Sequence, residues 1–189
     1  MSKEIRMSQL ENISQDEMVI EGYAATFDQP TVLYEIDGIE YKEVIERGAF
    51  DEADFKDCCL KYNHNDSVPI LARTRGGSLE LFVDDVGLRF KATLFNTQPA
   101  KDVYELVKQR ALDKCSFAFT IKEDNYDRNT HTRTIKKFDK IYDVSVVDIP
   151  AYDSTSVSAR SFFELENEKE RKELDNLNLR KKLMLRTML

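Results

Sequence analysis

A serine, a histidine and an aspartate that lie far apart in the chain carry the groups needed for nucleophilic catalysis. Ser116 begins a β-prone stretch on a face of small residues, where a substrate backbone can approach. His64 follows an apolar strand pattern, and a neutral imidazole there can act as a general base. Asp143 lies in a strongly β-prone run, where an acid is unfavourable unless it is paired or exposed. Pairing with an imidazole N–H meets that need, as in a serine-protease triad.

Each of these residues also has a purely structural interpretation. Ser116 can be a half-buried serine bonded to the backbone, His64 a hydrogen-bonded residue at a strand end, and Asp143 part of an exposed strand face. Cys115 is a rival nucleophile, because a thiol reacts more readily than a hydroxyl. Strand alternation sends Cys115 and Ser116 to opposite faces, so they cannot both point at one site.

Composition excludes several other kinds of chemistry. The 189 residues include 28 basic and 35 acidic side chains, for a net charge of −7, which argues against a nucleic-acid binder. There is no apolar run of membrane-spanning length, and three cysteines do not form a disulfide framework. We therefore expect a soluble protein of a reducing compartment. No metal-ligand spacing and no phosphate-binding glycine loop occurs, so we expect neither a metal nor a cofactor.

Most of the chain has the pattern of β-strands. Residues 18–27 predict a strand with a bulge, and residues 32–45 and 79–94 predict hairpins with turns at Asp37-Gly38 and at residues 84–87. Residues 58–64, 115–121 and 134–149 predict further strands, with Cys58, Leu60, Tyr62 and His64 on one side of the first. Apolar spacing predicts a helix over 99–112. A short helical piece is expected at 51–55, and a flexible polar loop at 124–132.

Composition changes after Arg160. Residues 161–189 are highly charged, contain neither glycine nor proline, and end in a basic cluster. We therefore predict a domain over residues 1–160 and a helical or disordered tail over residues 161–189, which serves as a docking or autoprocessing segment.

Short motifs between Val19 and Arg160 resemble, in order and spacing, those of the tailed-phage prohead protease family. They are Gly22-Tyr-Ala-Ala-Thr-Phe27, Glu46-Arg-Gly-Ala-Phe50, Tyr62-Asn-His-Asn-Asp66, Pro69-Ile-Leu-Ala-Arg73, Asp85-Val-Gly-Leu88, Ser116-Phe-Ala-Phe119, Tyr142-Asp-Val-Ser-Val-Val147 and Ile149-Pro-Ala-Tyr152.

The resemblance implies a fold and a function. The fold is α+β and mainly β, an antiparallel barrel similar to herpesvirus assemblin, flanked by a few helices. The function is that of a serine endopeptidase of capsid maturation, which acts in the host cytoplasm inside the assembling prohead. Its substrates are the scaffold, or the scaffold-like segment of the major capsid protein, and the protease itself. Assemblin-like enzymes act as dimers, so a homodimer is implied as well.

By position in these motifs, Ser116 is the nucleophile, His64 the base and Asp143 the third member of the triad. Many relatives have glutamate where this chain has Asp143, and glycine where it has Ala72. The backbone near Arg73 is the predicted oxyanion hole. The alternative hypothesis is a non-catalytic scaffold or capsid-binding module on the same fold, in which His64 and Ser116 lie far apart or bond only to backbone.

Overall fold

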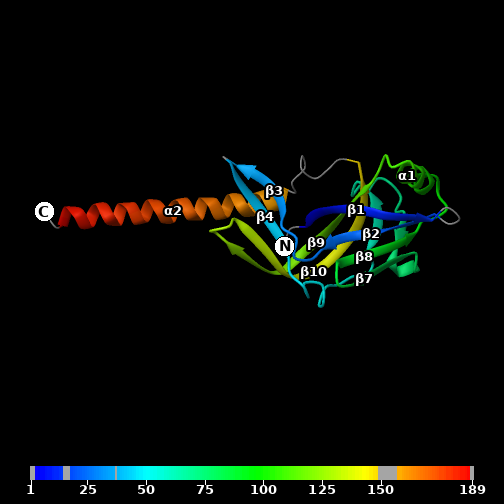
Figure 1. The fold of residues 1–189 in the computed structure, drawn as a ribbon, viewed down its shortest axis with the longest axis horizontal. Coiled ribbons are helices and arrows are strands. Elements are labelled where there is room, and N and C mark those ends of the chain that lie inside the picture. The colour runs from blue at the N-terminus through cyan, green and yellow to red at the C-terminus, as the bar shows by residue number, and fades with distance from the viewer. Residues whose placement is uncertain (1–2, 15–17, 37, 149–156, 188–189) are drawn as a thin grey trace.

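The computed structural model describes residues 3–14, 18–36, 38–148 and 157–187. Within them, the chain is mainly β, and a long helix extends from one end of the strands (Figure 1). The strands are β1 (Glu4–Ser14), β2 (Val19–Thr26), β3 (Thr31–Ile36), β4 (Ile39–Ile45), β5 (Cys59–Tyr62), β6 (Ala72–Arg73), β7 (Leu79–Val83), β8 (Gly87–Thr93), β9 (Lys114–Asp127) and β10 (Thr132–Val147). The helices are α1 (Gln98–Lys108) and α2 (Val157–Thr187), with one 3₁₀ turn at Thr74–Gly76.

The strands pair in the order β3-β4-β10-β9-β1-β2-β8-β7, and β5 joins β10 to β6. Most pairs are antiparallel, as the resemblance implies, but β4 and β5 both run parallel to β10. Strand β1 pairs first with β9 and then, beyond Gln9, with β2, so it links the two halves of the sheet. Among the described residues, no pairing joins β3 to β7. The mainly β fold is therefore confirmed, whereas a closed barrel is not observed.

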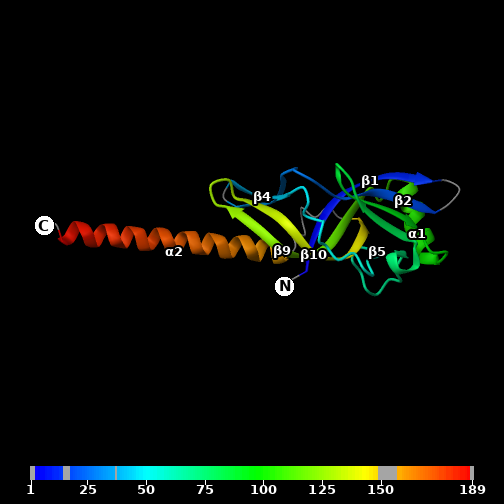
Figure 2. The ribbon, with the colours of Figure 1, turned by 90° about the horizontal axis from the view of Figure 1, so that it is seen from below.

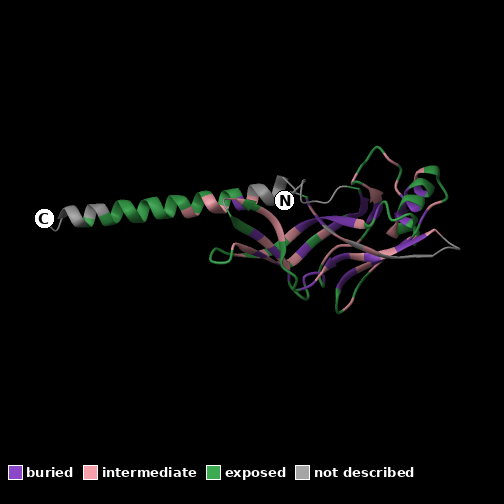
Figure 3. Ribbon diagram, turned by 45° about the horizontal axis from the view of Figure 1, so that its top comes forward, coloured by how far each residue is buried: buried purple, intermediate pink, exposed green. Residues whose placement is uncertain are grey.

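Phenylalanines from β9, from β10 and from the turn after β4 pack together in the core. Phe50 stacks on Phe138 with ring centroids 4.4 Å apart, and Phe117 stacks on Phe119 at 4.7 Å. All four rings are fully buried, and Figure 3 colours the buried parts of the strands purple. This core fixes β9 against β10, the two strands that carry Ser116 and Asp143.

Several local predictions hold, and others are wrong. The two hairpins form as β3–β4 and β7–β8, and Gly38 has a φ of +80°, which suits the predicted tight turn. Residues 51–55 form turns and a bridge to Lys140 instead of a helix. The predicted loop at 124–132 is mostly strand, since β9 continues to Asp127 and β10 begins at Thr132. The motif at residues 149–152 lies outside the described residues.

The two helices differ in how far they are buried. Helix α1 buries Ala100, Val103, Tyr104 and Val107 against the sheet, and ends four residues earlier than predicted, since Arg110 has a positive φ. Helix α2 contacts the strands and the β9–β10 turn along its first half, and most of its length is exposed (Figures 2 and 3).

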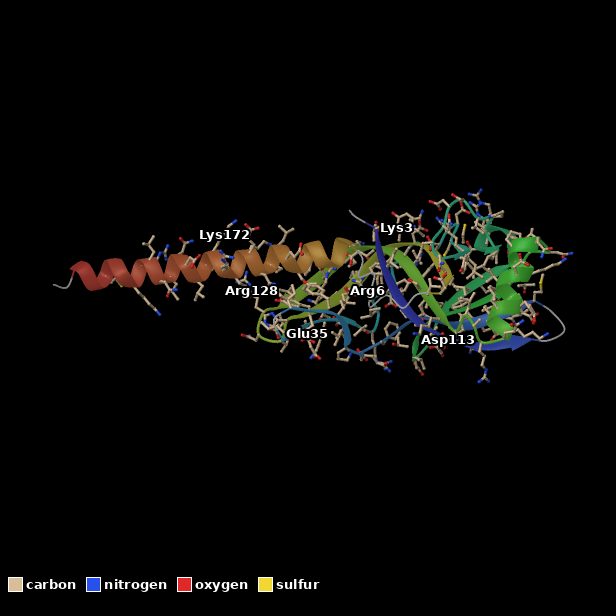
Figure 4. The ribbon with its side chains drawn as sticks, turned by 90° about the horizontal axis from the view of Figure 1, so that it is seen from above. Lys3, Arg6, Glu35, Asp113, Arg128 and Lys172 are labelled. Atoms are coloured by element: carbon tan, nitrogen blue, oxygen red, sulfur yellow. The ribbon has the colours of Figure 1, made fainter. Side chains whose placement is uncertain are left out.

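The start of α2 is held by aromatic contacts. Phe163 is fully buried, with its ring centroid 5.4 Å from Tyr34, 5.4 Å from Tyr41 and 5.6 Å from Tyr126. Arg128, in the β9–β10 turn beneath the helix, pairs with Glu173 (Figure 4).

Candidate active site

Ser116 lies near the start of β9, a strand that has β1 on one side and β10 on the other. Its Cα partners are Met7 on β1 and Ser145 on β10. Phe117 and Phe119 point into the core, so alternation turns Ser116 and Ala118 to the opposite face. Both faces of this part of β9 are buried, because other residues cover the face of small side chains.

His64 reaches the same face by a turn rather than by strand alternation. Strand β5 ends at Tyr62, and Asn63 and His64 both have a positive φ, of +52° and +53°. Asparagine and histidine are among the residue types that adopt this region most readily. The prediction that His64 continues the alternation of β5 with Leu60 is therefore wrong: the chain leaves the strand before it. One hydrogen bond that holds this turn on β10 runs from the Asn63 N–H to the Val146 carbonyl (2.9 Å).

An irregularity in β10 turns Asp143 toward Ser116. Ile141 pairs with Phe119, but Asp143 pairs with Ala118, so the register shifts between them at Tyr142. Since paired residues share a face, Ile141 lies on the core side and Asp143 on the side of Ser116. The sequence pattern places Ile141 and Asp143 on one face, and this prediction is wrong because an extra residue interrupts the alternation. The predicted pairing of Asp143 with Ser145 on one face holds.

These three elements bring His64, Ser116 and Asp143 into one hydrogen-bonded series. The Nε2 atom of His64 lies 2.9 Å from the Oγ atom of Ser116. On the other side of the ring, Nδ1 lies 2.5 Å from Oδ1 of Asp143. Asp143 and Ser116 are buried, while the His64 side chain is 15% exposed. A hydroxyl, an imidazole and a carboxylate in this order can transfer a proton from the hydroxyl through the imidazole.

Ser145 forms hydrogen bonds with both His64 and Asp143. Its Oγ atom accepts a hydrogen bond from the His64 backbone N–H (3.1 Å) and donates one to Oδ1 of Asp143 (3.1 Å). The bond from the His64 N–H is a second hydrogen bond that holds the turn after β5 on β10. Because Ser145 is fully buried in β10, it ties the position of His64 to the strand that carries Asp143.

Two lysines face the other carboxylate oxygen of Asp143. Lys3 donates from Nζ to Oδ2 at 2.8 Å, and Lys61 Nζ lies 3.8 Å from the same atom. Burial of Asp143 favours its neutral form and so raises its pKa. The hydrogen bond and charge of His64, together with those of Lys3, outweigh burial and lower the pKa to about 2. Asp143 is therefore ionised at neutral pH.

Cys115 lies on the opposite side of β9, in the core. It is fully buried, and its Sγ atom donates to the Tyr23 carbonyl at 3.2 Å. Burial raises the pKa of its thiol to about 12, so little of the reactive thiolate is present near neutral pH. These observations disfavour Cys115 as the nucleophile.

Arg73, the predicted oxyanion-hole position, is held by other partners. Its backbone N–H donates to the Ser78 hydroxyl (2.9 Å), and its guanidinium donates to both carboxylate oxygens of Asp57 (2.5 and 2.7 Å). Its role near the reacting atoms stays a prediction.

Sequence reasoning did not single out Lys3, Lys61 or Ser145 as members of this site. Ser145 had a signal, because it follows Asp143 at the spacing of one strand face. Lys3 had none, since 140 positions separate it from Asp143. Among the residues that the structure describes, no group of three His, Cys, Asp or Glu side chains is placed to hold a metal ion. In the same residues, no helix is long and apolar enough to cross a membrane.

A serine, histidine and aspartate hydrogen-bonded in series on a β domain are typical of serine hydrolases. Comparison with known families gives the particular one. The family model described as caudovirus prohead serine protease matches residues 3–170, so the chain belongs to that family. It is thus a serine peptidase of phage capsid maturation, a kind of protease that works inside the assembling prohead. No curated protein and no solved structure matches the chain.

Proposed function

We propose that this chain is an endopeptidase in which Ser116 is the nucleophile, His64 the general base and Asp143 the residue that orients the base. The observation that carries the proposal is the series of contacts at 2.9 Å and 2.5 Å through the His64 ring. The alternative of a non-catalytic capsid-binding module requires His64 and Ser116 to lie apart or to bond only to backbone. The contact between their side chains argues against it.

The reaction proceeds in two halves. Ser116 Oγ attacks the scissile carbonyl carbon while Nε2 of His64 takes the hydroxyl proton, and the tetrahedral intermediate collapses when His64 returns that proton to the leaving amine. A water molecule then attacks the acyl-enzyme by the same route and releases Ser116. Asp143 accepts the Nδ1–H of His64, which leaves Nε2 free to accept a proton, and its negative charge stabilises the imidazolium that forms.

We propose that the substrates are the scaffold, or the scaffold-like segment of the major capsid protein, and the protease itself, in the host cytoplasm. We expect the substrate segment to bind as an extended peptide, since β-rich proteases commonly bind substrate along a strand. The same proposal includes a domain over residues 1–160 and a tail over residues 161–189 that serves as a docking or autoprocessing segment. It also includes homodimer formation and a fold similar to assemblin. The exposed length of α2 supports such a role for the tail.

The experiment is co-expression with the cognate major capsid protein, followed by intact-mass analysis of both chains. Wild type is compared with Ser116→Ala, His64→Ala and, as a matched control on the neighbouring position of β9, Cys115→Ala. If the three residues act together, loss of Ser116 or His64 lowers turnover by roughly 10⁴- to 10⁶-fold, whereas Cys115→Ala cuts normally.

A loss below about tenfold in either Ser116→Ala or His64→Ala would refute the triad. Uncut partners in every sample, with assembly intact, would favour the non-catalytic module. Cleavage that survives Ser116→Ala but not Cys115→Ala would make the protein a cysteine peptidase.

A further inference from the structure

We propose that Lys3 is a positioning residue of the peptidase: its ammonium holds the Asp143 carboxylate in the orientation that serves His64. The inference rests on the proposed roles of Ser116, His64 and Asp143. It assigns to the beginning of β1 a part in catalysis that the motifs around the three site residues do not indicate.

The strand register explains how a residue so far away in sequence reaches the site. On one side of β9, Ala118 pairs with Ile5 of β1, and on the other side it pairs with Asp143 of β10. Lys3 lies two residues before Ile5, and alternation gives both the same face of the sheet. The Lys3 side chain therefore extends across β9 near Ala118 toward Asp143, and Figure 4 shows Lys3 next to the start of β1.

Two contacts fix the Lys3 ammonium. Its Nζ atom donates to Oδ2 of Asp143 at 2.8 Å, and it lies 5.3 Å from the ring centroid of Tyr142, within the range of a cation–π contact. Tyr142 is the residue at which the register of β10 shifts. The irregularity that turns Asp143 toward Ser116 therefore also presents an aromatic face to Lys3.

The two oxygens of Asp143 have separate tasks. Oδ1 faces His64 and Ser145, and Oδ2 faces Lys3. A carboxylate with no exposed surface needs a compensating charge, since burial strongly disfavours an isolated anion. Holding Oδ2 in place also stops the carboxylate from rotating, so that Oδ1 stays directed at the imidazole.

Other charged groups near Asp143 contribute less than Lys3. Lys61 of β5 lies 3.8 Å from Oδ2, and it also pairs with Asp66, so its charge is shared. The thiols of Cys58, just before β5, and Cys59, at its start, lie nearby, and burial raises the pKa of both, which keeps them neutral. Lys3 is thus the principal cation on this side of the carboxylate.

The neighbours of Lys3 on β1 anchor the segment that delivers it. Glu4 accepts from Arg133 at 2.8 and 3.0 Å, and the Arg6 guanidinium pairs with both carboxylate oxygens of Glu43. All four of these side chains are buried and lie on β1, β4 and β10. The start of β1 is therefore held by charge pairs to two other strands, and Lys3 is presented from a fixed backbone.

The test compares Lys3→Met, Lys3→Arg and Lys91→Met by their cleavage of the purified cognate capsid protein over pH 5 to 9. Lys91 is the matched control, since its side chain is 48% exposed against 43% for Lys3 and its partner is Glu21 of the same sheet half. Thermal melts establish that each variant is folded.

We expect Lys3→Met to lower kcat by roughly 10- to 100-fold, with KM changed less than about twofold, because the reacting groups lose their alignment. The acid-side midpoint of its pH–rate profile should move upward, since the negative charge of Asp143, no longer paired with Lys3, then favours the protonated imidazole more strongly. That midpoint does not depend on how much protein is folded. Lys3→Arg should recover most of the rate, and Lys91→Met should match wild type.

Two results would overturn the assignment: a Lys3→Met profile and kcat that match those of Lys91→Met, or a Lys3→Arg variant as impaired as Lys3→Met. Ser116→Ala in the same assay separates this proposal from the one it rests on. If Ser116→Ala is inactive and Lys3→Met is fully active, only the role of Lys3 fails. If Ser116→Ala keeps its activity, the proposed function itself fails.

Discussion

The ionised state of buried Asp143 leads to a measurable dependence of stability on pH. Its pKa in the folded protein is about 2, against an ordinary value of 3.8. A group whose pKa is lowered by folding stabilises the folded state above its unfolded pKa, and this contribution is lost as pH falls toward the folded pKa. From these two values the contribution is about 2 kcal/mol at pH 5 and about 1 kcal/mol at pH 3.

The perturbation is Asp143→Asn, which keeps the shape of the side chain and removes its charge. Both Asp143→Asn and its parent carry Ser116→Ala, so that neither chain can cleave itself. Urea unfolding is followed by circular dichroism, since the chain has no tryptophan. The difference in unfolding free energy between the two proteins should shrink by about 1 kcal/mol from pH 5 to pH 3. Other carboxylates titrate equally in both proteins and cancel, and a constant offset from the amide does not alter the change with pH.

A difference that stays constant between pH 5 and pH 3 would refute this reasoning. It would mean that contacts in the folded state do not lower the pKa of Asp143, and that neither His64 nor Lys3 stabilises its carboxylate. In the background with an intact Ser116, the same Asp143→Asn change should lower kcat by about 10⁴-fold, because an amide favours the wrong tautomer of His64.

Two further predictions concern the strands that position the site. A Cβ atom at Gly87 would lie 2.0 Å from the Ala25 carbonyl oxygen. Gly87→Ala should therefore destabilise the fold by roughly 3 kcal/mol and lower Tm by about 6 to 12 °C. A Tm within about 2 °C of wild type would contradict this prediction. Arg6→Met leaves buried Glu43 short of a partner and should lower the unfolding free energy by roughly 3 to 5 kcal/mol. The double variant Arg6→Met/Glu43→Leu should lose much less in urea unfolding, and an equal or greater loss would show that the pair is not the cause.

Local elements of the fold could be predicted because short stretches of sequence decide them. The alternation of residues 79–94 and the Asp37-Gly38 turn predict β3–β4 and β7–β8, since a positive φ and a two-residue period are properties of neighbouring residues. The limits came from contacts distant in the chain. Residues 51–55 carry a weak helical pattern, but a bridge from Asp54 to Lys140 holds them as turns.

The parallel pairing of β4 and β5 with β10 could not be predicted in the same way. Such pairings are made between residues distant in the chain, and their register depends on how the core packs. For the same reason, alternation failed at His64 and Asp143. It assumes an uninterrupted strand, but β5 ends before His64, and β10 has an extra residue at Tyr142.

The sequence by itself determined which reactive groups are present, a hydroxyl at Ser116, an imidazole at His64 and a carboxylate at Asp143, and the family whose motifs surround them. Only the tertiary structure decided that they meet. A left-handed turn, a register shift and three paired strands place them within 3 Å of one another in series. The same sheet brings Lys3 to Asp143 across 140 positions, because hydrogen-bonded pairing sets distances in space independently of separation along the chain.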